Sequence, residues 1–124
     1  MQNWENNFRL MKEKNRVKGD VGESQAYIFL KNNKFKILEQ NYKNKIGEID
    51  IIAEKGNKIY FIEVKKRSSL EFGYPCEAVN YYKKQKIKKV AQVYIMKNHV
   101  VEKEFQFSVI ELLGDKLNFI ENIF

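Results

Sequence analysis

The sequence predicts one domain of the α/β or α+β class, in which helices flank a central mixed sheet. Two segments have apolar residues at helical spacing, and shorter segments resemble strands, in the order helix, three strands, helix, one or two strands. The 124 residues suit a single domain, and 44% of hydrophobic residues is enough for a real core. We expect an N-terminal arm or short helix over residues 1–18 and the domain itself over residues 19–124.

Two segments are predicted to be helices. The first runs from Gly19 to Lys31 and ends at the polar residues 32–34. The second runs from Glu77 to about Lys97. Their apolar stripes consist of Ala26, Tyr27 and Leu30 in the first helix and Val79, Ile87, Val90 and Tyr94 in the second.

The remaining apolar segments are predicted to be strands. Residues 66–75 are expected to form a loop. Gly56-Asn57 is the signal of a two-residue hairpin turn between the second and third strands. The strand pattern covers four segments and a shorter fifth: 35–42, 46–53, 58–65, 105–112 and 117–120.

Charged residues alternate along one side of this hairpin. If the two-residue turn is the whole loop, Asp50 faces Glu63 and Glu48 faces Lys65. Side chains alternate between the two faces of a strand, so Asp50, Glu63 and Lys65 point the same way. Directly opposed like charges destabilise a strand pair, and something should therefore compensate Asp50 and Glu63.

A divalent cation is the simplest compensation. Mg²⁺ or Mn²⁺ would take the carboxylates of Asp50 and Glu63, with the main-chain carbonyl of Val64 as a third ligand. Such a metal polarises a phosphate and lowers the pKa of a bound water, and Lys65 would position or activate that water or stabilise charge on the phosphate. The alternative is an exposed strand face with ordinary surface ion pairs, because E-x-K is a common triplet. The residues expected to enter the core from the other face are Ile49, Ile51, Tyr60, Ile62 and Val64.

Two further charges lie on the apolar stripes of the predicted helices. Glu23 shares the stripe of the first helix, although an acid in the first turn is also favoured by the helix dipole. Lys83 falls inside the stripe of the second helix, where a long side chain can also reach back to solvent. Because both would point inward, the sequence favours a cluster that joins them to the charges of the hairpin.

Four motifs, taken in order, resemble those of a known family. They are GE followed by Ala26 at 22–26, GEIDII at 47–52, FIEVKKR at 61–67 and FG followed by EAV at 72–79, with Lys83 after them. This pattern resembles the YraN-like family of predicted bacterial endonucleases, which is similar to archaeal Holliday junction resolvases within the PD-(D/E)xK nuclease superfamily. The resemblance covers roughly residues 18–112 and implies a restriction-endonuclease-like α/β fold with helices on both sides of the sheet.

The resemblance also implies a site and a reaction. The reaction would be Mg²⁺-dependent hydrolysis of a phosphodiester, in branched or structured DNA, and related nucleases often act as homodimers. One departure concerns the late strand, which often reads Arg-Phe-Asp in such proteins and reads Gln106-Phe107-Ser108 here, so a supporting ion pair or DNA contact is in doubt. The implied active-site residues are Glu23, Asp50, Glu63 and Lys65, with Glu48 and Lys83 as neighbours.

The charge of the chain favours an anionic partner. The net charge is +7, and nucleic acid, DNA first, is the expected partner. The lysines of the second helix could equally form an ordinary solvated face. The residues expected to contact phosphates are Lys66, Arg67, Lys84, Lys88 and Lys89. Three tyrosines could stack on bases but are expected mainly in the core: Tyr74, Tyr81 and Tyr82.

The sequence therefore favours a metal-dependent endonuclease over two alternatives. One is a nuclease-like module that binds DNA or RNA without cutting, and the other is a protein-interaction adaptor whose charges are surface pairs. Opposed carboxylates favour chemistry, because a pure binding module has no need for them. With the single Cys76, no apolar leader and no segment able to span a bilayer, we expect a cytoplasmic protein without a membrane partner.

Overall fold

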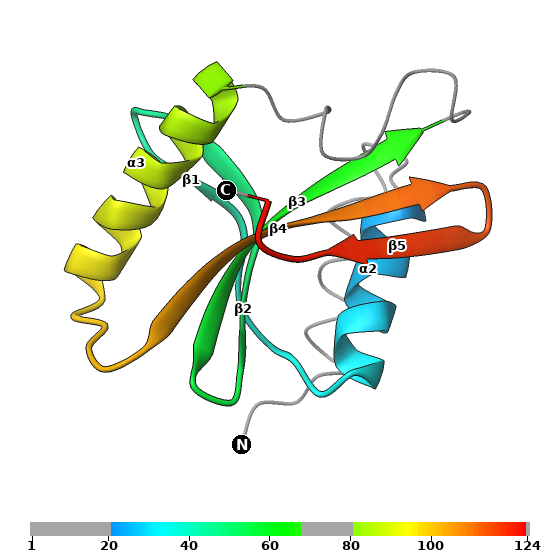
Figure 1. The fold of residues 1–124 in the computed structure, drawn as a ribbon, viewed down its shortest axis with the longest axis horizontal. Coiled ribbons are helices and arrows are strands. Elements are labelled where there is room, and N and C mark those ends of the chain that lie inside the picture. Colours follow the sequence, from blue (N-terminus) through cyan, green and yellow to red (C-terminus); the bar gives the residue numbers. More distant parts are fainter. Residues whose placement is uncertain (1–20, 68–80, 124) are drawn as a thin grey trace.

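A computed structural model of the chain describes residues 21–67 and 81–123, which form a mixed five-stranded sheet with a helix on each face (Figure 1). Side chains are described for residues 24–66 and 81–123. This architecture confirms the predicted class, an α/β fold with a mixed sheet flanked by helices. The expected arm over residues 1–18 lies outside the described residues. Along the chain the elements are α2 (Val21–Asn32), β1 (Lys36–Lys43), β2 (Glu48–Lys55), β3 (Lys58–Arg67), α3 (Tyr81–Lys97), β4 (Glu104–Leu113) and β5 (Lys116–Ile120).

The sheet is mixed because α3 lies between β3 and β4 in the chain. The strands follow sequence order across the sheet, and β3 and β4 are parallel while the other neighbours are antiparallel. Parallel neighbours cannot be joined by a tight turn and need a crossover connection, which here includes α3. The crossover places α3 against one face of the sheet, on the left in Figure 1.

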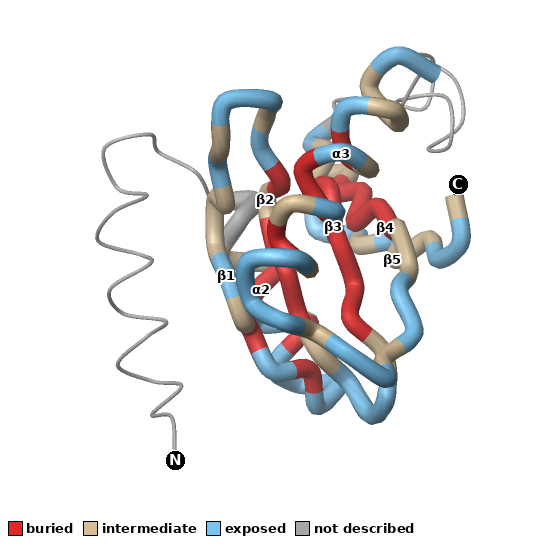
Figure 2. The backbone as a smooth tube through the Cα atoms, turned by 90° about the vertical axis from the view of Figure 1, so that its left-hand side faces the viewer, coloured by how far each residue is buried: buried red, intermediate tan, exposed pale blue. Residues whose placement is uncertain are grey.

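Two apolar clusters hold the helices on the sheet. Ile51 and Ile62 pack with α2, whereas their chain neighbours Ile52 and Phe61 pack with α3, as the alternation of side chains along a strand requires. We call these two sides the α2 face and the α3 face. Figure 2 shows the buried residues concentrated in the central strands between them. The helices contribute Ala26, Tyr27 and Leu30 on the α2 face and Ile87, Val90, Ala91 and Tyr94 on the α3 face.

The β2–β3 hairpin has the predicted turn. Gly56 adopts a φ of 60°, which glycine reaches without the steric penalty of other residues. From this turn to the pair Ile51–Ile62, the strands follow the predicted register. The ladder ends at that pair, so it does not include the two predicted pairs Asp50–Glu63 and Glu48–Lys65.

The regular alternation of β2 breaks at the same place. Ile49 packs in the cluster of the α3 face, and not with Ile51 on the α2 face. Its partner in β1 is Tyr42, which follows Asn41, a residue with a φ of 51°. The alternation of side chains is therefore irregular where β1 pairs with the start of β2. The prediction that Ile49 shares the face of Ile51 is wrong for this reason. The predicted core positions on the α2 face are confirmed for Ile51, Tyr60, Ile62 and Val64.

Several predicted strand boundaries differ from the structure by one or two residues, and two of the differences have a visible cause. The second strand begins at Glu48, because the side-chain oxygen of Asn44 accepts hydrogen bonds from the N–H groups of Ile46 at 2.8 Å and Gly47 at 3.2 Å and holds them in a turn. The third strand continues to Arg67, inside the expected loop, because β3 stays paired with β4 that far. The rest of that loop lies outside the described residues. Neither described helix has the length and apolar character needed to cross a lipid bilayer.

Both described helices end in a Schellman motif without glycine. At the end of α3, the Val100 N–H donates to the Ile95 carbonyl at 3.1 Å and the His99 N–H to the Met96 carbonyl at 3.3 Å. His99 has a φ of 51°, a conformation that residues with a Cβ adopt at a steric cost. In α2, Lys34 occupies the same position with a φ of 66°. A glycine at these positions would remove that cost.

We predict that His99→Gly stabilises the protein. Glycine adopts the left-handed conformation without strain, which stabilises the folded state, whereas the greater flexibility of the unfolded chain offsets part of this effect. The net gain in the free energy of unfolding should be about 0.5–1 kcal/mol. Urea unfolding of the variant and the wild type measures the difference. Asn98→Gly is the matched control and should lose stability, because Asn98 donates from its side chain to the Tyr94 carbonyl at 3.0 Å. A His99→Gly variant no more stable than wild type would contradict the strain argument.

Candidate active site

A pocket of about 310 Å³ lies where β2 and β3 face α3. Charges of both signs converge on it from three elements, and we call it the charged pocket. It brings together four residues that the sequence had singled out from three separate segments. Its walls consist of Gly47, Glu48, Asp50, Glu63, Lys83, Lys86, Ile87 and Val90.

Asp50 is anchored in this pocket by the neighbouring strand. Its Oδ2 accepts a hydrogen bond from the Val64 N–H at 2.8 Å, just beyond the end of the β2–β3 ladder. The carboxylate thus serves as the acceptor for a backbone group of β3. Burial, followed by the charge of Glu63, raises the pKa of Asp50 from 3.8 to about 6, although the hydrogen bond from Val64 opposes this rise. Keeping Asp50 charged at neutral pH therefore costs free energy.

Glu63 is the most buried carboxylate of the pocket. It lies on the α3 face of β3, and the residue is 9% exposed. Its Oε1 forms an ion pair with Lys83 Nζ at 2.8 Å. Its Oε2 is buried and accepts no hydrogen bond within the described part of the chain. The pocket thus contains an acceptor oxygen whose requirement is not met by the described side chains.

Lys65 and Lys83 share a side-chain hydrogen bond and have opposite pKa shifts. Burial, followed by the hydrogen bond and the charge of Lys83, lowers the pKa of Lys65. Burial also lowers the pKa of Lys83, but hydrogen bonds with Glu63 and Lys65 outweigh it, so the net shift is upward. An ammonium group can donate but cannot accept a hydrogen bond, so this contact favours the neutral form of one of the two amines. The directions of the shifts identify Lys65 as the amine that gives up its proton more readily.

The structure connects the other predicted site residues less directly with the centre of the charged pocket. Glu48 lines the pocket and is exposed. Val64 contributes its N–H to Asp50, and its carbonyl stays a predicted ligand. Glu23 belongs to the first turn of α2, but its side chain lies outside those described. Lys66 is exposed on the strand position next to Lys65 and therefore points to the opposite face from the pocket.

Glu111 is a buried acid that was not among the predicted site residues. It lies in β4, is 4% exposed, and is the register partner of Lys65 across the parallel β3–β4 pair. Alternation from Val109, which packs on the α3 face, puts Glu111 on that same face. A carboxylate at a core-facing position of a strand pattern was the available signal. Its partner in the sheet could not be deduced, because the pairing of β4 with β3 is not local.

Gln106 and Ser108, the two residues that differ from the Arg-Phe-Asp pattern, lie away from the charged pocket. Gln106 is the register partner of Tyr60, and Ser108 is the partner of Ile62. Tyr60 and Ile62 belong to the cluster of the α2 face, so Gln106 and Ser108 lie on that face. Within the described residues, the Gln106 Oε1 and Ser108 Oγ atoms are buried and have no hydrogen-bond partner. The difference from the Arg-Phe-Asp pattern therefore concerns packing on the α2 face and not the charged pocket.

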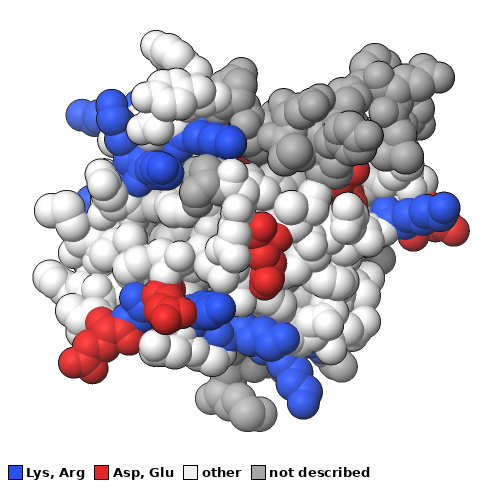
Figure 3. All heavy atoms as spheres, in the orientation of Figure 1, with Lys and Arg blue, Asp and Glu red and all other residues white. Residues whose placement is uncertain are grey.

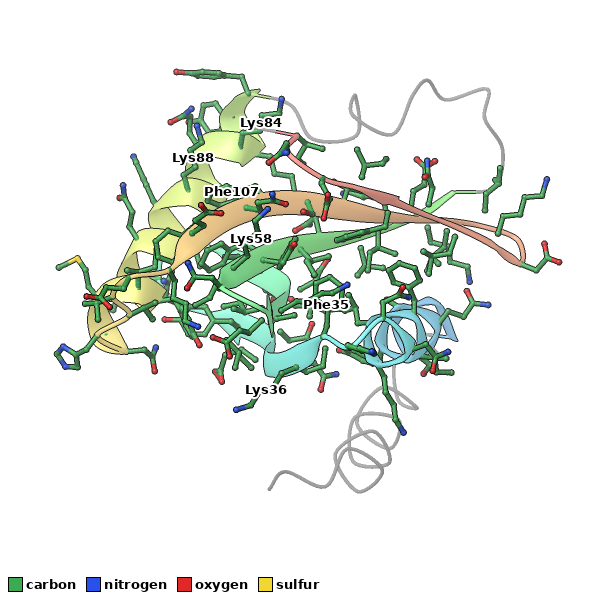
Figure 4. The ribbon with its side chains drawn as sticks, turned by 60° about the horizontal axis from the view of Figure 1, so that its bottom comes forward. Phe35, Lys36, Lys58, Lys84, Lys88 and Phe107 are labelled. Carbon is green, nitrogen blue, oxygen red and sulfur yellow. The ribbon has the colours of Figure 1, made fainter. Side chains whose placement is uncertain are left out.

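A basic surface covers α3. Lys84 and Lys88 are four residues apart and share one side of the helix, where Figure 4 shows them projecting from neighbouring turns. Both are half-buried, whereas Lys89 is exposed. Figure 3 shows basic side chains gathered over α3 at the upper left of the molecule. Arg67 ends β3, and its side chain is outside those described.

Two tyrosines next to this surface differ from their predicted environment. Tyr81 and Tyr82 are each 75% exposed and do not belong to the core. They are the first described residues of α3, and the Nζ of Lys86 lies 5.9 Å from the ring centre of Tyr82. Tyr74 lies outside the described residues. Exposed aromatic rings beside lysines are suited to stacking on bases.

The donors in the charged pocket fit a hard divalent cation. Within residues 21–67 and 81–123, no group of three or more Asp, Glu, His or Cys side chains is arranged around one point. Asp50 and Glu63 nevertheless share the pocket, and the Glu63 Oε2 has no hydrogen-bond partner there among the described residues. Mg²⁺ binds in proteins through one or two carboxylates and retains several waters, so two side chains suffice. Burial is the main cause of the raised pKa of Asp50, and the same cation would relieve the second cause, the repulsion from Glu63.

Comparison with known proteins places the chain among relatives of similar length. The model of the family described as "Uncharacterised protein family UPF0102" matches residues 22–112. A UPF0102 protein of Clostridioides difficile strain 630 is 50% identical over 112 residues, which cover 89% of this chain and 98% of the relative. A UPF0102 protein of Caldanaerobacter subterraneus is 47% identical over 113 residues, covering 86% and 93%. One of Acetivibrio thermocellus is 44% identical over 106 residues, covering 85% and 82%.

We predict that Asp50→Asn stabilises the metal-free protein at about pH 7.5. The folded pKa of about 6 lies above the ordinary 3.8, so the folded state binds the proton more tightly and loses stability as the pH rises through this interval. Asparagine removes the charge but keeps an oxygen for the Val64 N–H, and we expect a gain of about 1–3 kcal/mol. Thermal unfolding in EDTA measures the gain, which should shrink at about pH 4.5.

The exposed Asp115 provides the control for this prediction. It lies in the turn between β4 and β5, and Asp115→Asn should leave the unfolding temperature nearly unchanged. Equal stability of Asp50→Asn and wild type in EDTA at neutral pH would show that Asp50 carries no burial penalty.

Proposed function

The chain belongs to the uncharacterised protein family UPF0102, and we propose that it is a metal-dependent endonuclease that hydrolyses phosphodiester bonds in DNA. The observation that carries the proposal is the meeting of two carboxylates, Asp50 and Glu63, in the charged pocket. The charges of both act on Lys65, a lysine of lowered pKa in the same strand as Glu63. Paired carboxylates are ligands for hard cations, and an amine of lowered pKa is a suitable proton acceptor. Ionisable groups with shifted pKa values that gather at a pocket are typical of active sites.

The order of these residues along the chain supports the same reaction. An Asp on one strand and E-x-K on the next resemble the PD-(D/E)xK nucleases, and a mixed sheet between two helices is compatible with a restriction-endonuclease-like core. The resemblance to archaeal Holliday junction resolvases makes branched DNA the substrate to test first. It also makes a homodimer, with two pockets on one junction, the arrangement to examine.

The residues predicted for the site have separate roles in this proposal. When bound, Mg²⁺ or Mn²⁺ would polarise the scissile phosphate and lower the pKa of the attacking water. Asp50 and Glu63 would hold the metal, and the Val64 N–H fixes the position of the Asp50 carboxylate. Lys65 would accept the proton of the attacking water, because it is the amine of the lysine pair that deprotonates more readily. Glu48 lines the mouth of the pocket, and Glu23 stays a predicted member of the site.

The basic surface of α3 gives the proposed enzyme a path for its substrate. Lys84, Lys88 and Lys89 carry three positive charges on the helix that also forms a wall of the charged pocket. Contacts of this kind bind the phosphate backbone of any sequence. Tyr81 and Tyr82 would stack on bases exposed near a branch point.

A second candidate function is a module that binds nucleic acid without cutting it. The observation that favours it is the ion pair between Lys83 and Glu63, because Lys83 already supplies a cation to the pocket. In that case the carboxylates position a helix, and the lysines of α3 perform the function. The first candidate requires cleavage that is lost when Asp50 is removed, whereas the second requires no cleavage and nucleic-acid binding that survives the removal of Asp50.

We predict metal-dependent cleavage that requires Asp50 and Lys65. The substrates are a four-way junction, a flap and a plain duplex, each tested with Mg²⁺ and with Mn²⁺. Asp50→Ala and Lys65→Ala should each lower the cleavage rate by about a hundredfold or more, because metal binding and proton transfer depend on them. Asp115→Ala, which changes an exposed turn, should cleave like wild type. Absence of metal-dependent cleavage on all three substrates, or full activity of Asp50→Ala, would refute the nuclease proposal.

We also predict that DNA binding depends on the lysines of α3. In EDTA, the triple change of Lys84, Lys88 and Lys89 to alanine should reduce the slope of log affinity against log salt concentration by about 3, at roughly one per lost phosphate contact. Fluorescence anisotropy over a range of salt concentrations measures the slope. The matched control changes three exposed lysines at or next to β1, Lys36, Lys43 and Lys45, and should reduce the slope less. Equal slopes for the two triple variants would remove α3 as the binding surface.

A further inference from the structure

Lys83 is the one lysine of the charged pocket for which the structure gives a direct ion pair with a predicted metal ligand. Its Nζ lies 2.8 Å from Glu63 Oε1. Lys83 comes from α3, whereas Glu63 comes from β3, so the pair joins a helix to the strand beneath it. Lys86 also lines the pocket, one turn further along α3, with its Nζ near the ring of Tyr82.

We propose that Lys83 is an internal counter-ion that competes with the divalent cation for Glu63. In the metal-free protein its ammonium neutralises the carboxylate, and metal binding displaces it. This inference rests on the metal site of the proposed function and adds a way to regulate that site. The displaced ammonium then becomes available to a phosphate at the mouth of the pocket.

The geometry of Glu63 explains why the two cations compete. A Mg²⁺ ion lies about 2.1 Å from the oxygen it binds, and Lys83 already lies at hydrogen-bond distance from the same carboxylate. Two cations on one carboxylate repel each other, and a half-buried pocket screens this repulsion poorly. Glu63 Oε2 is the oxygen without a hydrogen-bond partner among the described residues, so it is where the metal would first bind.

The surroundings of Lys83 show what its departure would change. Asp50 and Glu63 both act on the charge of Lys83, so its removal without a substitute would leave two carboxylates facing each other. Lys65 shares a hydrogen bond with Lys83 and would lose that contact as well. A metal ion replaces the lost positive charge, whereas EDTA does not. The proposal therefore predicts opposite effects of removing Lys83 on metal affinity and on metal-free stability.

Calorimetric titration with Mn²⁺, without nucleic acid, tests the competition on the full chain. Lys83→Met should lower the dissociation constant by about tenfold, because the methionine side chain fills similar space without a charge. Lys86→Met is the matched control, since it removes one positive charge from the same pocket but leaves the Lys83–Glu63 pair intact. Lys86→Met should change the dissociation constant by no more than about threefold. Asp50→Ala should abolish the binding event and so identify it with this pocket.

Thermal unfolding in EDTA provides the second readout and needs no metal binding. Lys83→Met should unfold at a lower temperature than Lys86→Met, and added Mn²⁺ should raise the unfolding temperature of Lys83→Met more than that of wild type. Mn²⁺ binding to wild type with equal or weaker binding to Lys83→Met would overturn the competition and leave the metal site standing. No Mn²⁺ binding to either protein would overturn both the competition and the metal-dependent function.

Discussion

Two carboxylates held together in a half-buried pocket impose the constraint on which the rest of the site depends. Asp50 and Glu63 lose hydration and repel each other, so each must find compensation inside the protein. Asp50 receives the Val64 N–H, and Glu63 receives the ammonium of Lys83. Neither contact is completed within one element, so the arrangement holds only when β2, β3 and α3 are all in place.

The topology of the sheet meets this constraint through two local features. The β2–β3 ladder stops at Ile51–Ile62, which leaves the Val64 N–H to be bound by a side chain. The crossover from β3 to the parallel β4 returns α3 over the same face and brings Lys83 to a strand twenty positions earlier in the chain. The tight turn at Gly56 sets β2 beside β3 and so brings Asp50 close to Glu63. The longer connection that contains α3 brings Lys83 to the same place. The grouping of these charged side chains therefore depends on the topology of the sheet.

Periodicity and turn chemistry made most of the fold predictable, and inward charges made much of the site predictable. The register of the hairpin followed from Gly56, and Lys83 was visible as a charge inside an apolar stripe. The end of the ladder was not predictable, because there a carboxylate acts as the acceptor for a backbone N–H. Glu111 was missed because its relation to Lys65 depends on which distant strand pairs with β3. Local patterns carry no information about such pairings.

The separation of Gln106 and Ser108 from the charged pocket has a wider consequence. The sheet acts as a partition, and residues on its two faces share few side-chain neighbours, so their effects on free energy should add. An apolar residue in place of Ser108, whose hydroxyl is buried without a hydrogen-bond partner among the described residues, could offset the burden of the carboxylates. Substitutions beneath α2 can therefore change the stability of the fold without altering the electrostatics of the charged pocket on the opposite face.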